Sequence, residues 1–316
     1  MALAASWLLA CSPPGDQPPF VDISAEVGLA FEHDNGMTGE RYFSEVVGPG
    51  AALFDYDNDG DLDAFIVQGG SLDPAADPAT LPADMLWRND SAPGQDPSLR
   101  FVDVSAASGL DSTGYGMGVA TGDVNGDGRI DLYVTNFGPN RLWLNRGDGT
   151  FIDATTATLA EPRWSTSATF FDYDLDGDLD LFGANYVEYR IAQHRPCLNA
   201  AGAIEYCGPA SFQPETDRLW RNLGDGTFED VTGIAGFIDR SGSALGVVSS
   251  DFNGDGWPDL YVANDLMPNY LWLNQGDGTF AEDALLAGCA VNENGAPEAS
   301  MGLAVADFDR DGDEDL

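Results

Sequence analysis

Short apolar runs alternate with Asp- and Gly-rich turns along almost the whole chain. Runs such as AFIV (64–67), LYVT (132–135) and LYVA (260–263) are four residues long and apolar, as is typical of buried β-strands. An L-W-x-N run follows each of them, and then a short run of the F-x-D type. A small, Gly-rich run precedes each acidic turn. The pattern therefore predicts units of four short antiparallel strands joined by tight turns.

These units repeat at spacings of roughly 50 to 80 residues, which is typical of repeat architectures. Four antiparallel strands per unit, placed around an axis, form a β-propeller, whose blades bury their faces against their neighbours. A β-helix has much shorter repeats. We therefore expect an all-β fold, a β-propeller of four-stranded antiparallel blades. The expected blades span about 48–105, 114–157, 166–233 and 243–284, and a fifth begins with a first strand and an acidic loop.

A nine-residue acidic phrase, D-x-D/N-x-D-G-x-x-D, occurs once in each unit, at residues 55–63, 123–131, 172–180, 251–259 and 307–315. Oxygen atoms at positions 1, 3 and 5 can surround one hard cation, Gly at position 6 permits a sharp turn, and position 7 offers its backbone carbonyl. Asp at position 9 completes the set. Oxygen ligands without His or Cys indicate calcium. A solvated acidic loop is the alternative, but it does not explain the fixed register of Gly and Asp.

The phrases differ from EF-hands because strand-like sequence, rather than a helix, follows them and position 12 carries no Glu. We expect up to five calcium ions with a structural role and dissociation constants on the order of 10⁻⁴ to 10⁻³ M. The predicted metal-binding residues are Asp55, Asp57, Asp59, Asp61, Asp63, Asp123, Asn125, Asp127, Arg129, Asp131, Asp172, Asp174, Asp176, Asp178, Asp180, Asp251, Asn253, Asp255, Trp257, Asp259, Asp307, Asp309, Asp311, Asp313 and Asp315.

Several longer phrases resemble a known family. They are FVDISAEVGLAFEHDNG, FFDYDLDGDLDLFGANY, YCGPASF with DRLWRNLGDGTFEDVT, and ASMGLAVADFDRDGDEDL. They resemble the FG-GAP or VCBS repeats of integrin α-type propellers, and more closely the bacterial relatives of cartilage acidic protein, which often carry a C-terminal ASPIC/UnbV module. The resemblance implies a seven-bladed, usually extracellular propeller with structural calcium, which serves adhesion or ligand binding more often than catalysis.

The chain departs from this pattern because it ends inside the fifth repeat, without an ASPIC/UnbV segment. We therefore expect a fragment in which residues 20–316 form about four and a half of seven blades, as an open arc with exposed strand edges. Residues 20–24 (FVDIS) repeat the F-x-D type of run. We expect them to be the closing strand of the final blade.

The composition limits the possible partners. The chain has 53 acidic and 13 basic residues, for a net charge of −40, and all its basic residues are arginines. Such a negative field makes nucleic acids and anionic lipid surfaces poor partners. Without lysine, neither a Schiff base nor a P-loop can form.

The first 19 residues are predicted to be a signal segment with a Pro-rich tether. MALAASWLLAC resembles a bacterial lipobox, which would leave Cys11 lipidated at the cell envelope. Ordinary secretion and a chance match are the alternatives. The apolar run is too short to span a bilayer, so membrane contact is expected only through this lipid anchor.

The cysteines and tryptophans have structural interpretations. Cys197 and Cys207 bracket a short segment inside an insertion and are predicted to form a disulfide. The alternative is a zinc site that adds His194. Cys289 is expected to be a buried small residue. The tryptophans at 87, 143, 220 and 272 recur at one place in each unit, so we expect blade packing rather than a sugar-binding platform.

These observations favour a calcium-binding extracellular module for binding or adhesion, whose ligand is a protein or a glycan. The alternative is a calcium-dependent enzyme that acts on extracellular polysaccharide through paired carboxylates. His33 and His194 are the only histidines, and no G-x-S-x-G, H-E-x-x-H or dinucleotide-binding pattern is present. We therefore predict no catalytic residues.

Overall fold

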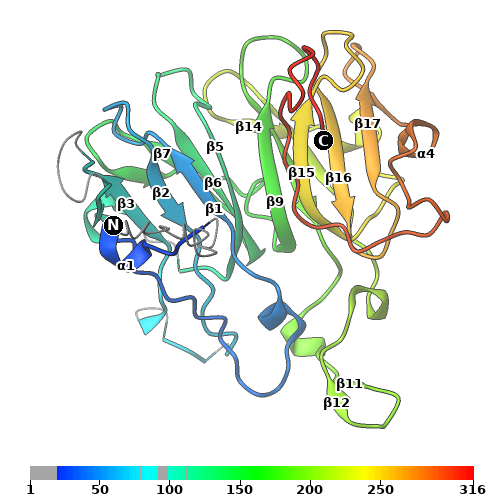
Figure 1. Cartoon of the computed structure of the whole chain (residues 1–316), viewed down its shortest axis with the longest axis horizontal. Helices are drawn as coiled ribbons and strands as arrows, with labels where there is room; N and C mark the ends of the chain where they lie inside the picture. The colour runs from blue at the N-terminus through cyan, green and yellow to red at the C-terminus, as the bar shows by residue number, and fades with distance from the viewer. Residues whose placement is uncertain (1–19, 74, 78–79, 92–98, 111–112) are drawn as a thin grey trace, which may run out of the picture.

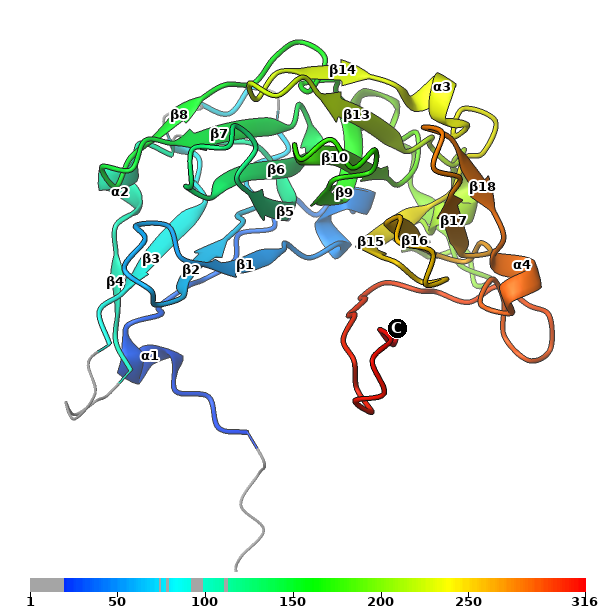
Figure 2. The ribbon, with the colours of Figure 1, turned by 90° about the horizontal axis from the view of Figure 1, so that it is seen from above.

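Four antiparallel blades stand side by side in an open arc (Figure 2). The computed structural model describes residues 20–316 except 74, 78–79, 92–98 and 111–112. The predicted tether and Cys11 lie outside the described residues.

Each blade has four strands in sequence order from the concave side of the arc to its outer surface (Figure 2). Blade one consists of β1 (Ala51–Phe54), β2 (Asp63–Ile66), β3 (Met85–Asn89) and β4 (Phe101–Asp103). Blade two consists of β5 (Gly116–Gly122), β6 (Asp131–Gly138), β7 (Arg141–Asn145) and β8 (Phe151–Asp153). Blade three consists of β9 (Arg163–Phe171), β10 (Asp180–Asn185), β13 (Arg218–Asn222) and β14 (Phe228–Asp230). Blade four consists of β15 (Ala244–Ser250), β16 (Asp259–Asn264), β17 (Tyr270–Asn274) and β18 (Phe280–Glu282).

The innermost strands converge so closely that side chains do not fit everywhere. A Cβ atom added to Gly118 of β5 would lie 2.5 Å from the carbonyl oxygen of Thr166 on β9. One added to Gly246 of β15 would lie 2.3 Å from the carbonyl oxygen of Met301. These close approaches explain the Gly-rich first strand that the sequence shows.

Apolar side chains fill the space between neighbouring blades. The tryptophans of the third strands, Trp87, Trp143, Trp220 and Trp272, are 1 to 4% exposed, which confirms their predicted packing role. Between blades three and four, for example, Phe182 and Leu219 pack in one cluster with Trp272. Each blade therefore depends on its neighbour for a core, as expected of a repeat protein.

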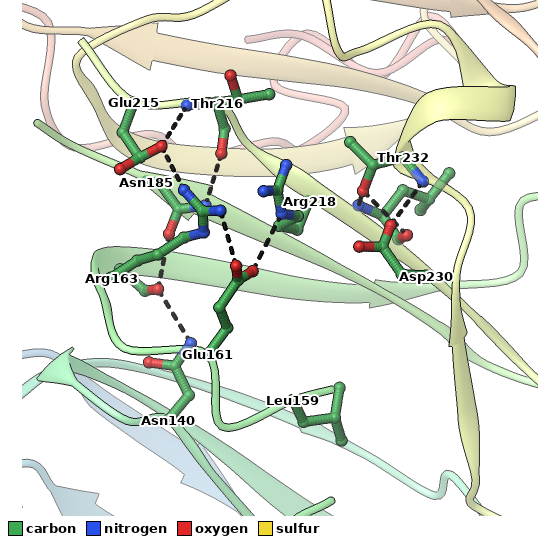
Figure 3. A network of polar contacts seen from close by, with 12 residues as sticks. Asn140, Leu159, Glu161, Arg163, Asn185, Glu215, Thr216, Arg218, Asp230 and Thr232 are labelled. Carbon is green, nitrogen blue, oxygen red and sulfur yellow. Dashed lines mark hydrogen bonds and ion pairs between the residues drawn. The ribbon is translucent and has the colours of Figure 1, made fainter. Parts of the chain in front are cut away.

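Blades two and three are joined by additional contacts. The ends of β6 and β9 pair with each other at Phe137↔Trp164 and Gly138↔Arg163. Beside this pairing, Asn140 donates to the hydroxyl of Ser165, which donates to Asn185 (2.9 and 2.7 Å; Figure 3). Two blades thus share one continuous eight-stranded sheet.

A short helical turn, which was not predicted from the sequence, follows the last strand of blades one, three and four. These turns are α2 (Ser105–Ser108), α3 (Thr232–Ala235) and α4 (Ala284–Ala287), and a related turn, α1 (Ser24–Val27), precedes blade one. Each ends at a glycine with left-handed backbone geometry. Within the described ranges, no helix has the length and apolar character needed to cross a membrane.

Two predicted strands are not formed. Residues 20–23 have no strand geometry, and Phe20 is 90% exposed. Residues 301–306, the expected first strand of blade five, form only an isolated bridge between Ala306 and Asp315. A strand needs a partner for its backbone hydrogen bonds, and no described strand pairs with either segment.

The insertion of blade three lies between β10 and β13 and projects from one rim (Figure 1). It contains η3 (Ile191–Gln193), β11 (Cys197–Leu198), β12 (Ile204–Glu205) and η4 (Pro209–Ser211). The Cys197–Cys207 disulfide is formed, with Cα atoms 5.2 Å apart. The zinc alternative is wrong, because both sulfurs are in the disulfide and the ring of His194 bonds the Tyr189 hydroxyl and the Glu40 carbonyl (both 3.0 Å).

The segment that precedes β1 packs against this insertion. Phe43, in the 3-10 helix η1 (Phe43–Val46), stacks on Phe212 with ring centroids 5.4 Å apart. Arg41 donates to the carbonyl of Ile204 (2.6 Å), and the Tyr206 hydroxyl donates to Glu45 (2.8 Å). The insertion is therefore fixed to the segment that leads into blade one as well as to blade three.

Candidate metal centres

The first four acidic loops each connect the first and second strands of a blade. Their ninth residue is the first residue of the second strand, where Asp63, Asp131, Asp180 and Asp259 are fully buried. The fifth loop, residues 307–315, is exposed. Strands rather than helices flank the four blade loops, so the EF-hand alternative is excluded by the fold as well as by the sequence.

The carboxylate at position 1 accepts hydrogen bonds from backbone N–H groups later in the same loop. In loop one, Asp55 accepts the backbone N–H of Asp59 at one oxygen and that of Gly60 at the other (3.1 and 2.9 Å). Loops two, three and four repeat both contacts from Asp123, Asp172 and Asp251. In loop five, Asp307 accepts the N–H of Asp311 (3.1 Å). The same side chain thus shapes the turn in all five loops.

Two positions in each loop have left-handed backbone geometry, and only one of them was predicted from the sequence. Gly at position 6 was predicted. Position 4 is also left-handed, with φ between 58° and 71°. Its residues are Asn58, Gly126, Leu175, Gly254 and Arg310. The Gly and Asn residues at this position were an available signal, because these types tolerate positive φ.

The carboxylate at position 9 is held by two backbone donors. In loop three, Asp180 accepts the N–H of Tyr173 at one oxygen and the N–H of Asn222 at the other (3.0 and 2.8 Å). Burial raises the pKa of Asp180 to about 7, although both hydrogen bonds favour its ionised form. Burial likewise raises the pKa values of Asp63, Asp131 and Asp259 to about 6.

Three carboxylates converge in three of the loops. One oxygen each from Asp55, Asp57 and Asp63 lies within 4.8 Å of the others, and the same holds for Asp172, Asp174 and Asp180. In loop five the converging residues are Asp307, Asp309 and Asp311, at positions 1, 3 and 5. Loops two and four carry an amide at position 3 instead, from Asn125 and Asn253.

These donors suit a hard divalent cation. They are all oxygens, and several lie close enough together for one ion to bridge them. Burial, followed by the charges of Asp59 and Asp55, raises the pKa of Asp57, and burial and the Asp176 charge do the same for Asp174. A cation at this point would offset both the repulsion and the burial of charge. The described residues therefore fit calcium.

The remaining predicted positions have other contacts. The Asp59 and Asp176 carboxylates do not join the converging groups of their loops. Asp127 pairs with Arg129. In loops two and four, position 7 directs its side chain to the outer hairpin of the same blade, because a Cβ on Gly147 would meet Arg129 and one on Gly276 would meet Trp257. This leaves the backbone carbonyl as the ligand expected from position 7.

An asparagine that supports each blade loop was not among the residues predicted from the sequence. It ends the L-W-x-N strand, as Asn89, Asn145, Asn222 and Asn274, and its backbone N–H donates to the position 9 carboxylate (2.7 to 2.8 Å). Its recurrence in every unit was visible in the sequence. Buried Asn needs hydrogen-bond partners, so this recurrence was a signal for a conserved contact within the structure.

Four-stranded blades, each with an acidic loop between its first and second strands, define an incomplete β-propeller. The FG-GAP-like repeat family matches residues 55–134, 123–183, 207–262 and 251–316, which together cover more than half of the chain. The chain therefore belongs to the FG-GAP-like repeat family.

The chain is also similar to whole proteins. It is 25% identical to mouse (Mus musculus) cartilage acidic protein 1 over an alignment of 316 positions, which covers 95% of this chain and 43% of the relative. For the human (Homo sapiens) protein the identity is 26%, over 95% of this chain and 42% of the relative. The chain thus spans less than half the length of these curated relatives. Among solved structures, a lectin of Agrocybe aegerita that recognises non-reducing terminal N-acetylglucosamine matches at 19% identity and a TM-score of 0.40, over 75% of this chain and 51% of the lectin.

Proposed function

We propose that this chain is a calcium-stabilised extracellular binding module, whose ions fix the turns between the first two strands of its blades. The convergence of three carboxylate oxygens within 4.8 Å, in loops one, three and five, carries this proposal. The residues proposed as ligands are those predicted from the sequence. Calcium that binds only the folded chain would stabilise it by mass action.

We place the ligand-binding surface on the rim opposite the acidic loops. Antiparallel strands put the loop between β9 and β10 at one end of blade three and the insertion after β10 at the other. The acidic loops are alike in the four blades, whereas the connections at the opposite rim differ from blade to blade. Surface loops that vary on a rigid scaffold are where binding residues concentrate.

A cavity of about 500 Å³ opens at this rim, between blades two and three. Arg163 lies in its wall and bridges Glu161 and Glu215, and Arg218 contacts Glu161 (3.3 Å; Figure 3). Phe137, Trp164 and Tyr189 also line the cavity, and Trp164 and Tyr189 are themselves largely buried. Charged and aromatic groups together suit a polar partner, either an extracellular protein or a glycan.

The disulfide supports a location outside the cytoplasm. Cys197 and Cys207 join the two arms of an exposed hairpin, and such bonds persist in oxidising compartments. We propose export to the cell envelope, where lipidation of Cys11 would anchor the chain. The net charge of −40 makes nucleic acid an unfavourable partner.

Thermal unfolding in calcium and in chelator tests the proposal. At ten times its dissociation constant, each occupied site adds about 1.4 kcal/mol of stability, so calcium is expected to raise the melting temperature by several degrees. Asp174→Asn, in loop three, should reduce this increase, and the control Asp239→Asn, at an exposed position outside the loops, should not. Equal melting temperatures in calcium and in EDTA would contradict the proposal.

A further inference from the structure

Loops one, two and three each contact the following blade through a buried asparagine side chain. Loops one and two are also joined by the exposed Asn58, whose amide donates to the carbonyl of Gly128 (3.2 Å). Asn145, at the end of β7 in blade two, is 2% exposed. Its amide nitrogen donates to the carbonyl of Tyr56, in loop one, at 2.7 Å, and to the carbonyl of Ile130, in loop two, at 3.2 Å. Its amide oxygen accepts the N–H of Gly147 (2.9 Å). One side chain thus joins two loops of different blades.

The same contact recurs at the next two interfaces. Asn222 donates to the carbonyl of Val124 in loop two (2.7 Å) and to that of Leu179 in loop three (2.9 Å). Asn274 donates to the carbonyl of Tyr173 in loop three (2.8 Å) and to that of Pro258 in loop four (3.2 Å). Each contact to the preceding blade ends on the residue at position 2 of its loop.

The residue at position 2 lies between the proposed ligands at positions 1 and 3. Its backbone N–H donates to the carboxylate at position 9. Tyr56 donates its N–H to Asp63 (2.9 Å) and offers its carbonyl to Asn145, whose own N–H donates to Asp131 (2.7 Å). Asp131 accepts the N–H of Val124 (3.0 Å), and the pattern continues through loops three and four. A continuous chain of hydrogen bonds therefore runs through four proposed metal sites.

This chain has little freedom to rearrange. The amides of Asn145, Asn222 and Asn274 each use both their donor and acceptor groups, and a reversed amide would place its oxygen against two carbonyls. A metal ion that fixes the oxygens of one loop also fixes position 2 and position 9 of that loop. Through the asparagine, the loop of the neighbouring blade is then partly ordered before its own ion binds.

We propose that Asn145, Asn222 and Asn274 are positioning residues that couple calcium binding between neighbouring blades, so that an occupied loop raises the affinity of the loops beside it. This inference rests on the calcium binding proposed above. The coupling expected from one buried hydrogen bond is about three- to tenfold in affinity.

The chain contains its own control. Asn89, in blade one, makes the same contacts within its blade, to Asp63 (2.7 Å), to the carbonyl of Leu62 (3.0 Å) and from the N–H of Ser91 (3.1 Å). Among the described residues it has no contact with another loop. Its removal weakens loop one without removing a bridge.

Calcium titration followed by hydrogen exchange and mass spectrometry reads each loop separately. Asp127→Asn removes a proposed ligand of loop two but lies outside the hydrogen-bonded chain. It should raise the calcium midpoint for protection of residues 55–63, in loop one, by about three- to tenfold. Adding Asn145→Ala should abolish this response, and adding Asn89→Ala should preserve it.

Three results separate the possible outcomes. If Asp127→Asn raises the calcium midpoint of loop two but leaves that of loop one unchanged, the coupling is wrong. This result does not depend on whether Asn145→Ala folds. If the response persists in Asn145→Ala, the coupling exists but this asparagine does not carry it, which also overturns the inference. If calcium protects none of the loops in the unmodified chain, the proposed function itself fails.

Discussion

Blades one and three differ from blades two and four at the same set of positions. The odd blades carry Asp57 and Asp174 at the third loop position, where the even blades carry Asn125 and Asn253. They also carry Arg88 and Arg221 before the asparagine that ends the third strand. Burial raises the pKa values of Asp57 and Asp174, and these cations partly oppose that rise. The even blades have Leu144 and Leu273 there. An additional carboxylate in the loop is thus accompanied by a nearby arginine.

A second pair of positions alternates in the same way. Before each third strand, a side-chain oxygen accepts a backbone N–H, at 2.7 to 2.9 Å, in all four blades. In the even blades this residue is Asn140 or Asn269, whose amide also donates to the hydroxyl of Tyr133 or Tyr261 (3.0 and 2.9 Å). The odd blades have Asp84 and Asp217, together with Phe65 and Phe182 in place of the tyrosines. The backbone requires an acceptor, and the neighbouring ring decides whether Asp or Asn supplies it.

The largest effect on stability is expected when Asn140 of blade two is replaced by the Asp that blades one and three carry at the same position. Asn140→Asp removes the donors to Tyr133 and Ser165 and buries a charge beside them. The expected loss is about 2–4 kcal/mol at pH 8, measured by denaturant unfolding. The control is Asn294→Asp, the same change at an exposed turn. An unchanged unfolding midpoint would show that the ring and the acid are independent.

A smaller effect is expected from the loops themselves. Loops one and three should bind calcium about tenfold more tightly than loops two and four, because the charge of the ligands tunes affinity. Gradual removal of calcium by a chelator, followed loop by loop through hydrogen exchange, measures the order of release. Asp57→Asn should bring loop one to the level of loop two. Release of all four loops at one calcium concentration, in a chain with Asn145, Asn222 and Asn274 replaced by Ala, would contradict the difference.

The smallest effect on stability is expected when Asp217 of blade three is replaced by the Asn of the even blades. Burial raises the pKa of Asp217 to about 7, above its unfolded value near 3.9, so the folded state binds this proton more strongly. Stability therefore falls as the pH rises from about 4 to 7 and remains lower above pH 7.

Asp217→Asn should remove this loss of stability. We expect the free energy of unfolding to rise by about 1 kcal/mol at pH 8 and to change little at pH 4. The gain is limited because Phe182 offers the new amide no hydroxyl. Unfolding curves across this pH range give the measurement, with Asp239→Asn as the exposed control. A gain of equal size at both pH values would show that ionisation of Asp217 is not the cause.

Sequence patterns predicted the strands wherever a neighbouring strand was present. The apolar runs before and after the first four acidic phrases became β-strands, because their alternation and the turns between them are local signals. Residues 20–24 and 301–306 have similar patterns but remain irregular, because strand formation depends on a partner that local sequence does not reveal. The helical turns α1 to α4 were missed for another reason, since four residues are too few to show helical periodicity.

The loop positions were predictable to different degrees. Spacing alone predicted that positions 1, 3 and 9 of loops one and three meet, as they do. Spacing did not show that Leu175 and Arg310 adopt positive φ, because these residue types rarely do so. Nor did it show that Asn145 reaches Tyr56, 89 residues earlier in the chain. Contacts across a blade interface follow from the curvature of the arc, which no single repeat encodes.

The alternation of blades also bears on ring closure. The fifth repeat carries Asp309 and Asp313 at loop positions 3 and 7, which is the odd pattern again. Blades of two kinds that strictly alternate can form a closed ring without two like neighbours only when the number of blades is even. A seven-membered ring would bring two odd blades together at a single seam, and that seam would differ chemically from every other junction in the circle.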